Sequence, residues 1–175
     1  MRIGGTLGGV TASAGQVGER GVDSALLGEW MDVALGEARA ALEHGDVPVG
    51  ALVVAVDSGA VIARRHNERE LTGDPTAHAE MLALRDAAAT VGTWRLDEYA
   101  LVATVEPCPM CAGAAGAARV ALVVFGVADP KAGARGSLYN LAADPRLNHS
   151  PQVVAGVREQ DASDLMRAFF GSRRG

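Results

Sequence analysis

The chain has 175 residues, of which 49% are hydrophobic and 21% are charged. These values are typical of a globular domain and exclude a wholly disordered or fibrous protein. No apolar run approaches the roughly 18 residues that a membrane span needs, and the glycine-diluted start does not predict a signal peptide. The net charge of −5 argues against non-specific coating of nucleic acid, and two cysteines make no disulfide framework. We therefore expect a cytoplasmic protein.

The glycine-rich composition of residues 1–23 predicts a flexible tail. Seven of the 22 glycines fall within the first 21 residues, with almost no large apolar side chain among them, so this segment buries too little surface to order itself. From Leu26 to Leu42 the apolar residues recur at helical spacing, and Gly45 is a plausible stop. We expect one domain over residues 24–175.

The remaining pattern alternates between strands and helices. It predicts strands at 49–56, 61–63, 99–105, 120–126 and 153–154, and helices at 74–89, 107–118 and 161–170. A short helix is expected between the polar loop 129–137 and the last strand. Because parallel pairs need helical crossovers, this order predicts an α/β fold in three α/β/α layers, with a mixed sheet of about five strands.

Two short motifs carry the candidate chemistry. One reads Pro-Thr-Ala-His-Ala-Glu and ends at Glu80, and the other reads Glu-Pro-Cys-Pro-Met-Cys and ends at Cys111. Cysteines at positions i and i+3 lie on one side of a helix start, where the helix dipole favours thiolates. Two thiolates and the His78 imidazole would leave a tetrahedral zinc with an open fourth position, which is typical of a catalytic site.

Two other readings of the cysteines remain open at this point. A thioredoxin-like dithiol is disfavoured because the flanking sequence lacks the usual tryptophan. A purely structural zinc would need a fourth ligand, yet His44 sits at a helix end, and His66 and His149 each adjoin an asparagine in a loop.

The His-x-Glu motif followed by Pro-Cys-x-x-Cys is the known signature of zinc-dependent nucleobase deaminases. Zinc lowers the pKa of its bound water, so hydroxide forms near neutral pH. Glu80, two residues beyond His78, would lie beside the metal without ligating it. There it would take the water proton, pass it to the ring nitrogen and help to protonate the leaving amine.

With these motifs the chain resembles the bacterial tRNA-specific adenosine deaminases of the cytidine-deaminase-like superfamily. The likeness runs from about Leu26 to Arg174 and includes segments beyond the zinc motifs, among them 129–133 and 147–149. It implies conversion of the wobble adenosine of an arginine tRNA to inosine, one Zn²⁺ per chain, and a homodimer. The small-residue run 112–118 would let another helix approach closely, and burial inside the monomer would explain its alanines equally well.

The resemblance also implies substrate contacts. Asn67 would bond the flipped nucleoside, and the backbone of Ala79 would contact the base. Anticodon-loop nucleotides would meet Asp129 and Asn148, and the candidates for phosphate contact are Lys131, His149, Arg173 and Arg174. Lys131 is the only lysine in the chain, which mildly favours a specific role. Turn chemistry is the alternative explanation for Asp129 and Asn148, and Phe169 and Phe170 fit the core better than base stacking.

Two further functions remain as alternatives. One is a zinc deaminase of free guanine, cytosine or a nucleoside. The other is a non-catalytic, zinc-stabilised RNA-binding module. Glu80 argues against the second, because binding alone needs no proton shuttle beside an open zinc position.

Overall fold

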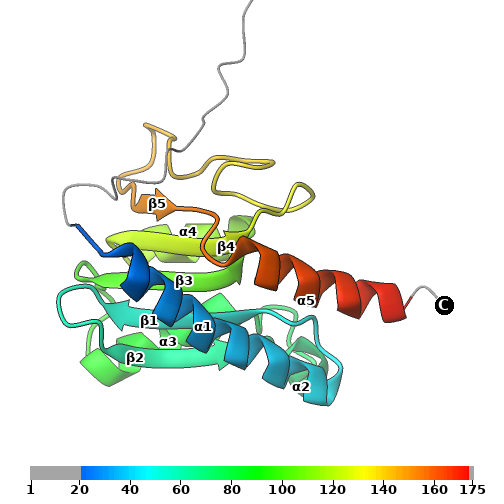
Figure 1. Ribbon diagram of the computed structural model, residues 1–175. Coiled ribbons are helices and arrows are strands. Elements are labelled where there is room, and N and C mark those ends of the chain that lie inside the picture. The colour runs from blue at the N-terminus through cyan, green and yellow to red at the C-terminus, as the bar shows by residue number, and fades with distance from the viewer. Residues whose placement is uncertain (1–20, 174–175) are drawn as a thin grey trace, which may run out of the picture.

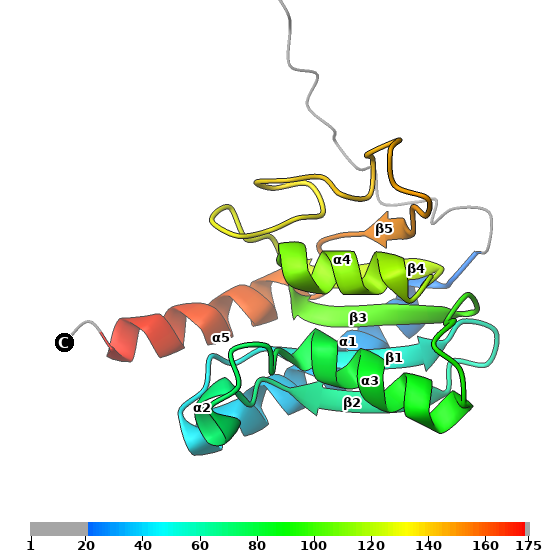
Figure 2. The ribbon, with the colours of Figure 1, turned by 180° about the vertical axis from the view of Figure 1, so that it is seen from behind.

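A five-stranded sheet lies between two layers of helices. The computed structural model describes residues 21–173. The strand order is β2-β1-β3-β4-β5, with β1 antiparallel to β2 and β3, and with β3, β4 and β5 mutually parallel. Helices α1 and α5 cover one face, and α3 and α4 cover the other (Figures 1 and 2). The predicted three-layer fold and mixed sheet are confirmed.

The elements have these bounds. The strands are β1 (Gly50–Ala55), β2 (Val61–His66), β3 (Tyr99–Val105), β4 (Leu122–Val127) and β5 (Gln152–Val154). The α-helices are α1 (Ser24–Ala40), α2 (Arg69–Thr72), α3 (Ala79–Val91), α4 (Pro109–Ala117) and α5 (Glu159–Ser172). A 3-10 turn, η1 (Ala41–His44), continues α1 up to Gly45, whose φ of 77° is the left-handed conformation that suits glycine.

Alternate residues of the central strands fill two separate cores. In β3, Leu101 and Ala103 pack with α3 and α4, whereas Ala100 and Val102 pack with α1. Both sets are fully buried. The continuous apolar runs of β1, β3 and β4 follow from this burial on both faces, because a strand covered on both sides has no solvent-facing position.

The start of α1 belongs to the folded domain. The carboxylate of Asp23 accepts a hydrogen bond from the N–H of Ala25 and caps the helix, and Val22 is buried in the core beneath α1. The rest of the predicted tail, residues 1–20, lies outside the described residues. No helix in the described part of the chain is long and apolar enough to span a bilayer.

Three sequence predictions need correction. The second helix begins at Ala79 instead of Asp74, because the Asp74 carboxylate bonds the N–H and hydroxyl of Thr76 in a local turn. Strand β2 extends to His66, which pairs with Gly50. The expected short helix after residue 137 does not form, and residues 138–151 are irregular. The one-turn α2 was not predicted.

Helix α1 lies so close to β1 that only glycine fits at position 50. A Cβ on Gly50 would stand 2.0 Å from the carbonyl oxygen of Ala34 and 2.6 Å from the nitrogen of Ala38. Since both are backbone atoms, Gly50→Ala should lower the free energy of unfolding by about 3 kcal/mol or more. Gly36→Ala, on the exposed side of the same helix with nothing within 4 Å of the new methyl, should instead be neutral or stabilising. Chemical denaturation of both variants checks this.

Candidate metal centre

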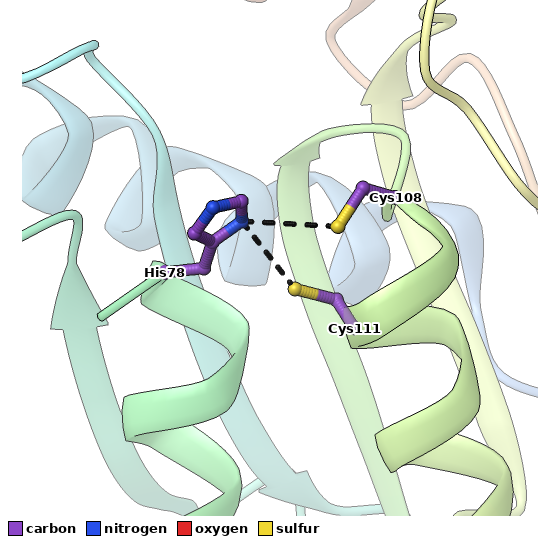
Figure 3. A group of neighbouring side chains, drawn as sticks. All are labelled: His78, Cys108 and Cys111. Atoms are coloured by element: carbon purple, nitrogen blue, oxygen red, sulfur yellow. Dashed lines mark hydrogen bonds between the residues drawn. The ribbon is translucent and has the colours of Figure 1, made fainter. Parts of the chain in front are cut away.

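Two helix starts meet at one edge of the sheet and bring three ligand atoms together. His78 is the N-cap of α3, Cys108 is the N-cap of α4, and Cys111 lies in the first turn of α4 (Figure 3). Pro109 opens α4 at a position where the missing backbone N–H is not needed. Both cysteines therefore lie at the start of α4, where free backbone N–H groups and the positive end of the helix dipole favour thiolates. His78 lies at the corresponding position of α3.

The spacing of these atoms fits a tetrahedral zinc ion. The Nδ1 atom of His78 lies 3.8 Å from the Sγ of Cys108 and 3.6 Å from the Sγ of Cys111. Zinc–sulfur bonds of about 2.3 Å and a zinc–nitrogen bond of about 2.0 Å at tetrahedral angles separate the ligands by about 3.6 Å. Among the described residues, this is the group of His, Cys, Asp and Glu side chains whose ligand atoms lie close enough to hold a metal.

The two thiols have different pKa values before metal binds. A hydrogen bond from Cys111 lowers the pKa of Cys108 to about 4, so this sulfur is already a thiolate at neutral pH. The same hydrogen bond, with burial, raises the pKa of Cys111. A zinc site needs both thiolates, so metal binding must displace the proton held by Cys111.

Glu80 lies beside the three ligands as a buried carboxyl group. It is only 4% exposed, and its Oε2 atom has no hydrogen-bond partner. Burial raises the pKa of Glu80, and the nearby His78 offsets part of that rise. A buried oxygen without a partner, next to an open coordination position, is suited to bind a water or a substrate nitrogen.

A cavity of about 810 Å³ opens over this centre, and His78, Glu80 and Cys108 lie in its wall. Its apolar lining includes Val47, Val49, Val105, Val127, Met166 and Phe170. Its basic residues are Arg69, Lys131, Arg167 and Arg173. Its size and mixed lining are those of a small-molecule or nucleotide site.

Three of the six predicted substrate-binding residues line this cavity: Asn67, Asp129 and Lys131. The amide of Asn67 is held by the protein, since its Oδ1 accepts the N–H of Ala79 at 2.9 Å and its Nδ2 donates to the carbonyl of Val47 at 3.2 Å. Ala79 is fully buried, and its backbone N–H is already used in the hydrogen bond to the side chain of Asn67. The structure does not place Ala79 in the cavity wall.

Asn148 and His149 lie at the other end of the sheet. The Nε2 atom of His149 lies 2.7 Å from the carbonyl oxygen of Val120, before β4 begins, and the carbonyl of Asn148 accepts a hydrogen bond from Arg119. The metal centre instead follows the end of β3. Neither residue lines the cavity.

Sequence reasoning missed two of the basic residues in the cavity wall, Arg69 and Arg167. Arg69 lies on the unpredicted α2, and Arg167 lies on the exposed side of the predicted last helix. Neither position belongs to an apolar repeat or a ligand motif, so no signal in the sequence marked them. Of the predicted terminal arginines, Arg173 donates to the carbonyl of Gly45 and stacks on Phe169, and Arg174 lies outside the described residues.

Known proteins share both the motif and the fold. Residues 26–127 match the family described as the cytidine and deoxycytidylate deaminase zinc-binding region. The match contains all three ligands and Glu80, and it covers more than half of the chain. The chain therefore belongs to the zinc-dependent deaminases of this family, and its ligand cluster is a zinc site.

Relatives that match over most of their length identify the family within the zinc-dependent deaminases. The tRNA-specific adenosine deaminase of Bacillus subtilis (strain 168) is 48% identical over 145 residues, 83% of this chain and 89% of that protein. That of Agrobacterium fabrum (strain C58) is 40% identical over 83% of this chain and 94% of that protein. The chain belongs to the tRNA-specific adenosine deaminase family, as the sequence resemblance indicated.

Solved structures agree with this placement. A structure from work on A-to-I editing by tRNA:A34 deaminases superposes with a TM-score of 0.75 at 39% identity, over 78% of this chain and 98% of that one. A guanine deaminase from Nitrosomonas europaea superposes with a TM-score of 0.66 at 23% identity, over 86% and 85%. The second likeness shows the shared fold alone.

Replacing a sulfur ligand should remove metal and stability together. Cys108→Ser and Cys111→Ser each leave zinc with two strong protein ligands, and the binding energy of zinc at such a site is also folding energy. We expect zinc content well below one per chain and a lower melting temperature in both variants, by metal analysis and thermal denaturation. Full zinc occupancy in both would contradict the ligand assignment.

Proposed function

We propose that the chain hydrolyses the 6-amino group of the wobble adenosine in a tRNA anticodon loop, leaving inosine and releasing ammonia. The observation that carries this proposal is the placement of Glu80, a buried carboxyl with one unpartnered oxygen, beside the three zinc ligands at the floor of a cavity. The named activity of the relatives supports adenosine in tRNA as the substrate.

Zinc, when bound, supplies a Lewis acid that makes water nucleophilic near neutral pH. Glu80 supplies the proton transfers. Burial raises its pKa above that of a free glutamate, which favours the reversible proton transfers that a general acid–base catalyst makes. It takes one proton from the attacking water, delivers it to the adenine ring nitrogen, and then helps to protonate the departing amine.

The cavity walls suit one extruded nucleotide of a single strand. A base must leave its stack to reach the metal, so affinity comes from neighbouring nucleotides and phosphates as well as from the base itself. Apolar side chains of β3, of β4 and of the segment just before β1 line the interior, together with four cationic residues. The wall also carries the acidic residues Glu80, Glu106 and Asp129, so the cations favour an anionic ligand where they lie apart from these three carboxyl groups.

Asn67, Asp129 and Lys131 are the proposed substrate contacts within the cavity. Lys131 forms no ion pair within 4.0 Å with any carboxylate of the described residues. Its ammonium group is therefore available to a phosphate. Any contact of Asn148 or His149 with RNA would fall at the opposite end of the sheet. Because its substrate is tRNA, we place the enzyme in the cytoplasm.

Glu80→Ala should separate catalysis from metal binding. The variant keeps all three ligands, so about one zinc per chain should remain, while activity falls by roughly 10²–10⁴-fold or more because one residue serves several proton transfers. Single-turnover deamination and metal analysis on the same preparation check this. Loss of zinc with unchanged activity per bound metal would assign Glu80 a different role.

The substrate itself is tested with a purified anticodon stem-loop and, separately, with free adenosine, guanine and cytosine, scoring inosine and ammonia. The stem-loop should be converted, and free adenosine poorly or not at all. Efficient conversion of guanine or cytosine with an untouched stem-loop would establish the free-base alternative.

Two variants test the proposed substrate contacts. Asp129→Ala should weaken conversion of the stem-loop with zinc intact, and Lys131→Ala should reduce the salt dependence of binding by about one phosphate contact.

We also propose that the enzyme is a homodimer that pairs through α3 and α4. An apolar hollow of about 310 Å³ lies between these helices, lined by Met81, Leu84, Trp94 and three alanines of α4 and its end, among others. Trp94 is 60% exposed. Exposed apolar side chains gathered in one hollow, here with Arg85 at its wall, are typical of an interface.

Analytical ultracentrifugation should find a dimer at micromolar concentration. Ala117→Arg, on the exposed side of α4, should shift the equilibrium to monomer, because it places a charge within the apolar hollow. Ala25→Arg, exposed on α1 across the sheet, is the matched control and should leave the dimer intact. A monomeric parent enzyme with full activity would refute the pairing.

A further inference from the structure

Glu106 is a buried carboxylate with four donors around it. It directly follows β3 and is 3% exposed. Its Oε1 accepts the backbone N–H groups of Arg135 at 2.8 Å and Ser137 at 3.0 Å. Its Oε2 accepts the N–H of Asp129 at 3.0 Å and the hydroxyl of Ser137. All four donors lie in the segment 129–137, which we call the cavity loop.

The hydrogen bonds around Glu106 fit a carboxylate, because all four groups that contact its oxygens donate. A carboxylate that only accepts can serve four donors, two at each oxygen. A glutamine amide cannot, because its NH₂ group would face two of the donors.

Two more hydrogen bonds tie the cavity loop to the zinc-binding segment. The N–H of Ala134 donates to the carbonyl of Pro107 at 2.9 Å, and the guanidinium of Arg135 donates to the carbonyl of Ala112 at 2.8 Å. Arg135 is 5% exposed. With Glu106, these contacts lie on both sides of the two zinc-binding cysteines.

The packing against Glu106 leaves no spare volume. A Cβ on Gly133 would lie 2.3 Å from the carboxyl carbon and from Oε2 of Glu106, and 2.6 Å from the carbonyl oxygen of Asp129. A side chain at position 133 must therefore push the loop away from the carboxylate. Asp129, Lys131 and Ala132, on the same loop, line the cavity over the metal.

We propose that Glu106 is a positioning residue, which holds the cavity loop in register with the zinc ligands so that Asp129 and Lys131 face the bound nucleotide. This inference rests on the proposed function, because it assigns those two residues to substrate. The role of Glu106 is indirect, because its four hydrogen bonds to the cavity loop occupy both carboxylate oxygens. Glu106 acts on the substrate through the position of Asp129 and Lys131 on that loop.

The first test compares Glu106→Gln with the parent enzyme on the anticodon stem-loop. A displacement of about 1 Å in a positioned group can cost on the order of 10²-fold, so KM should rise by roughly 10- to 100-fold. Zinc should stay at about one per chain, and kcat should change less than KM. Glu98→Gln, an exposed glutamate with the same change of charge, is the control and should match the parent.

Lys131→Ala measured in both backgrounds distinguishes positioning from a general loss of structure. If Glu106 acts through the loop, Lys131→Ala weakens binding in the parent but has little further effect in the Glu106→Gln variant. Such coupling is the mark of residues that act together. Equal effects of Lys131→Ala in both backgrounds would overturn the proposal.

Gly133→Ala tests the same contact from the other side and keeps Glu106 itself intact. It should raise KM with retained zinc, as Glu106→Gln does. Gly36→Ala, where nothing lies within 4 Å of the new methyl group, is its control. Parent-like kinetics in both Glu106→Gln and Gly133→Ala would refute the proposal.

Hydrogen–deuterium exchange gives a readout that needs no substrate. The amides of Asp129, Arg135 and Ser137 should lose protection in Glu106→Gln, while amides of β3 keep theirs. If the parent enzyme fails to act on the stem-loop and these amides still lose protection, the proposed substrate is wrong and the positioning role of Glu106 stands. Unchanged protection at all three amides would overturn that role.

Discussion

The meeting of two helix N-termini at one edge of the sheet is the constraint on which the site depends. Each helix start carries about half a positive charge, so two of them facing one another repel unless anions lie between them. The thiolates of Cys108 and Cys111 supply two negative charges, and a zinc ion balances both. Glu80, in the first turn of α3, lies at the same meeting point. The catalytic group is thus held by the helix start that also carries a metal ligand.

The mixed sheet explains why these helix starts are neighbours. Strand β3 pairs antiparallel with β1 on one side and parallel with β4 on the other. The segment after β2 leads to α3, and β3 leads directly to α4, so both helices begin at the same edge of the sheet (Figure 2). Helix α1 packs against Gly50 of β1 on the opposite face. The close fit there fixes the position of β1 against α1.

Much of this could be predicted from the sequence because it depends on local spacing. The apolar period marked α1, and β3 has the predicted bounds. The two motifs identified His78, Cys108 and Cys111 as a group because ligand chemistry requires particular residues at short separations. Their convergence within 4.8 Å in the structure agrees with that expectation.

What could not be predicted depends on contacts distant in sequence. Helix α2 has four residues and none of them is buried, so no periodicity marks it. Its Glu70 N–H is held by the carboxylate of Asp46, which lies 24 positions earlier in the chain. Glu106 likewise bonds residues 23 to 31 positions away. In the sequence it is only the first residue of the second motif, and the folded chain alone shows its four donors.

The connection 128–151 shows how one segment serves both the topology and the cavity. Because β4 and β5 are parallel, the chain must return from the end of β4 to its start, across six residues or about 20 Å of extended strand. No helix makes this crossing, so side chains must anchor an irregular segment at each end. Glu106 anchors its first part beside the metal, whereas Arg119 and the carbonyl of Val120 hold Asn148 and His149 at the far end. The same connection therefore lines the cavity where it leaves β4 and sets the register of β5 where it arrives.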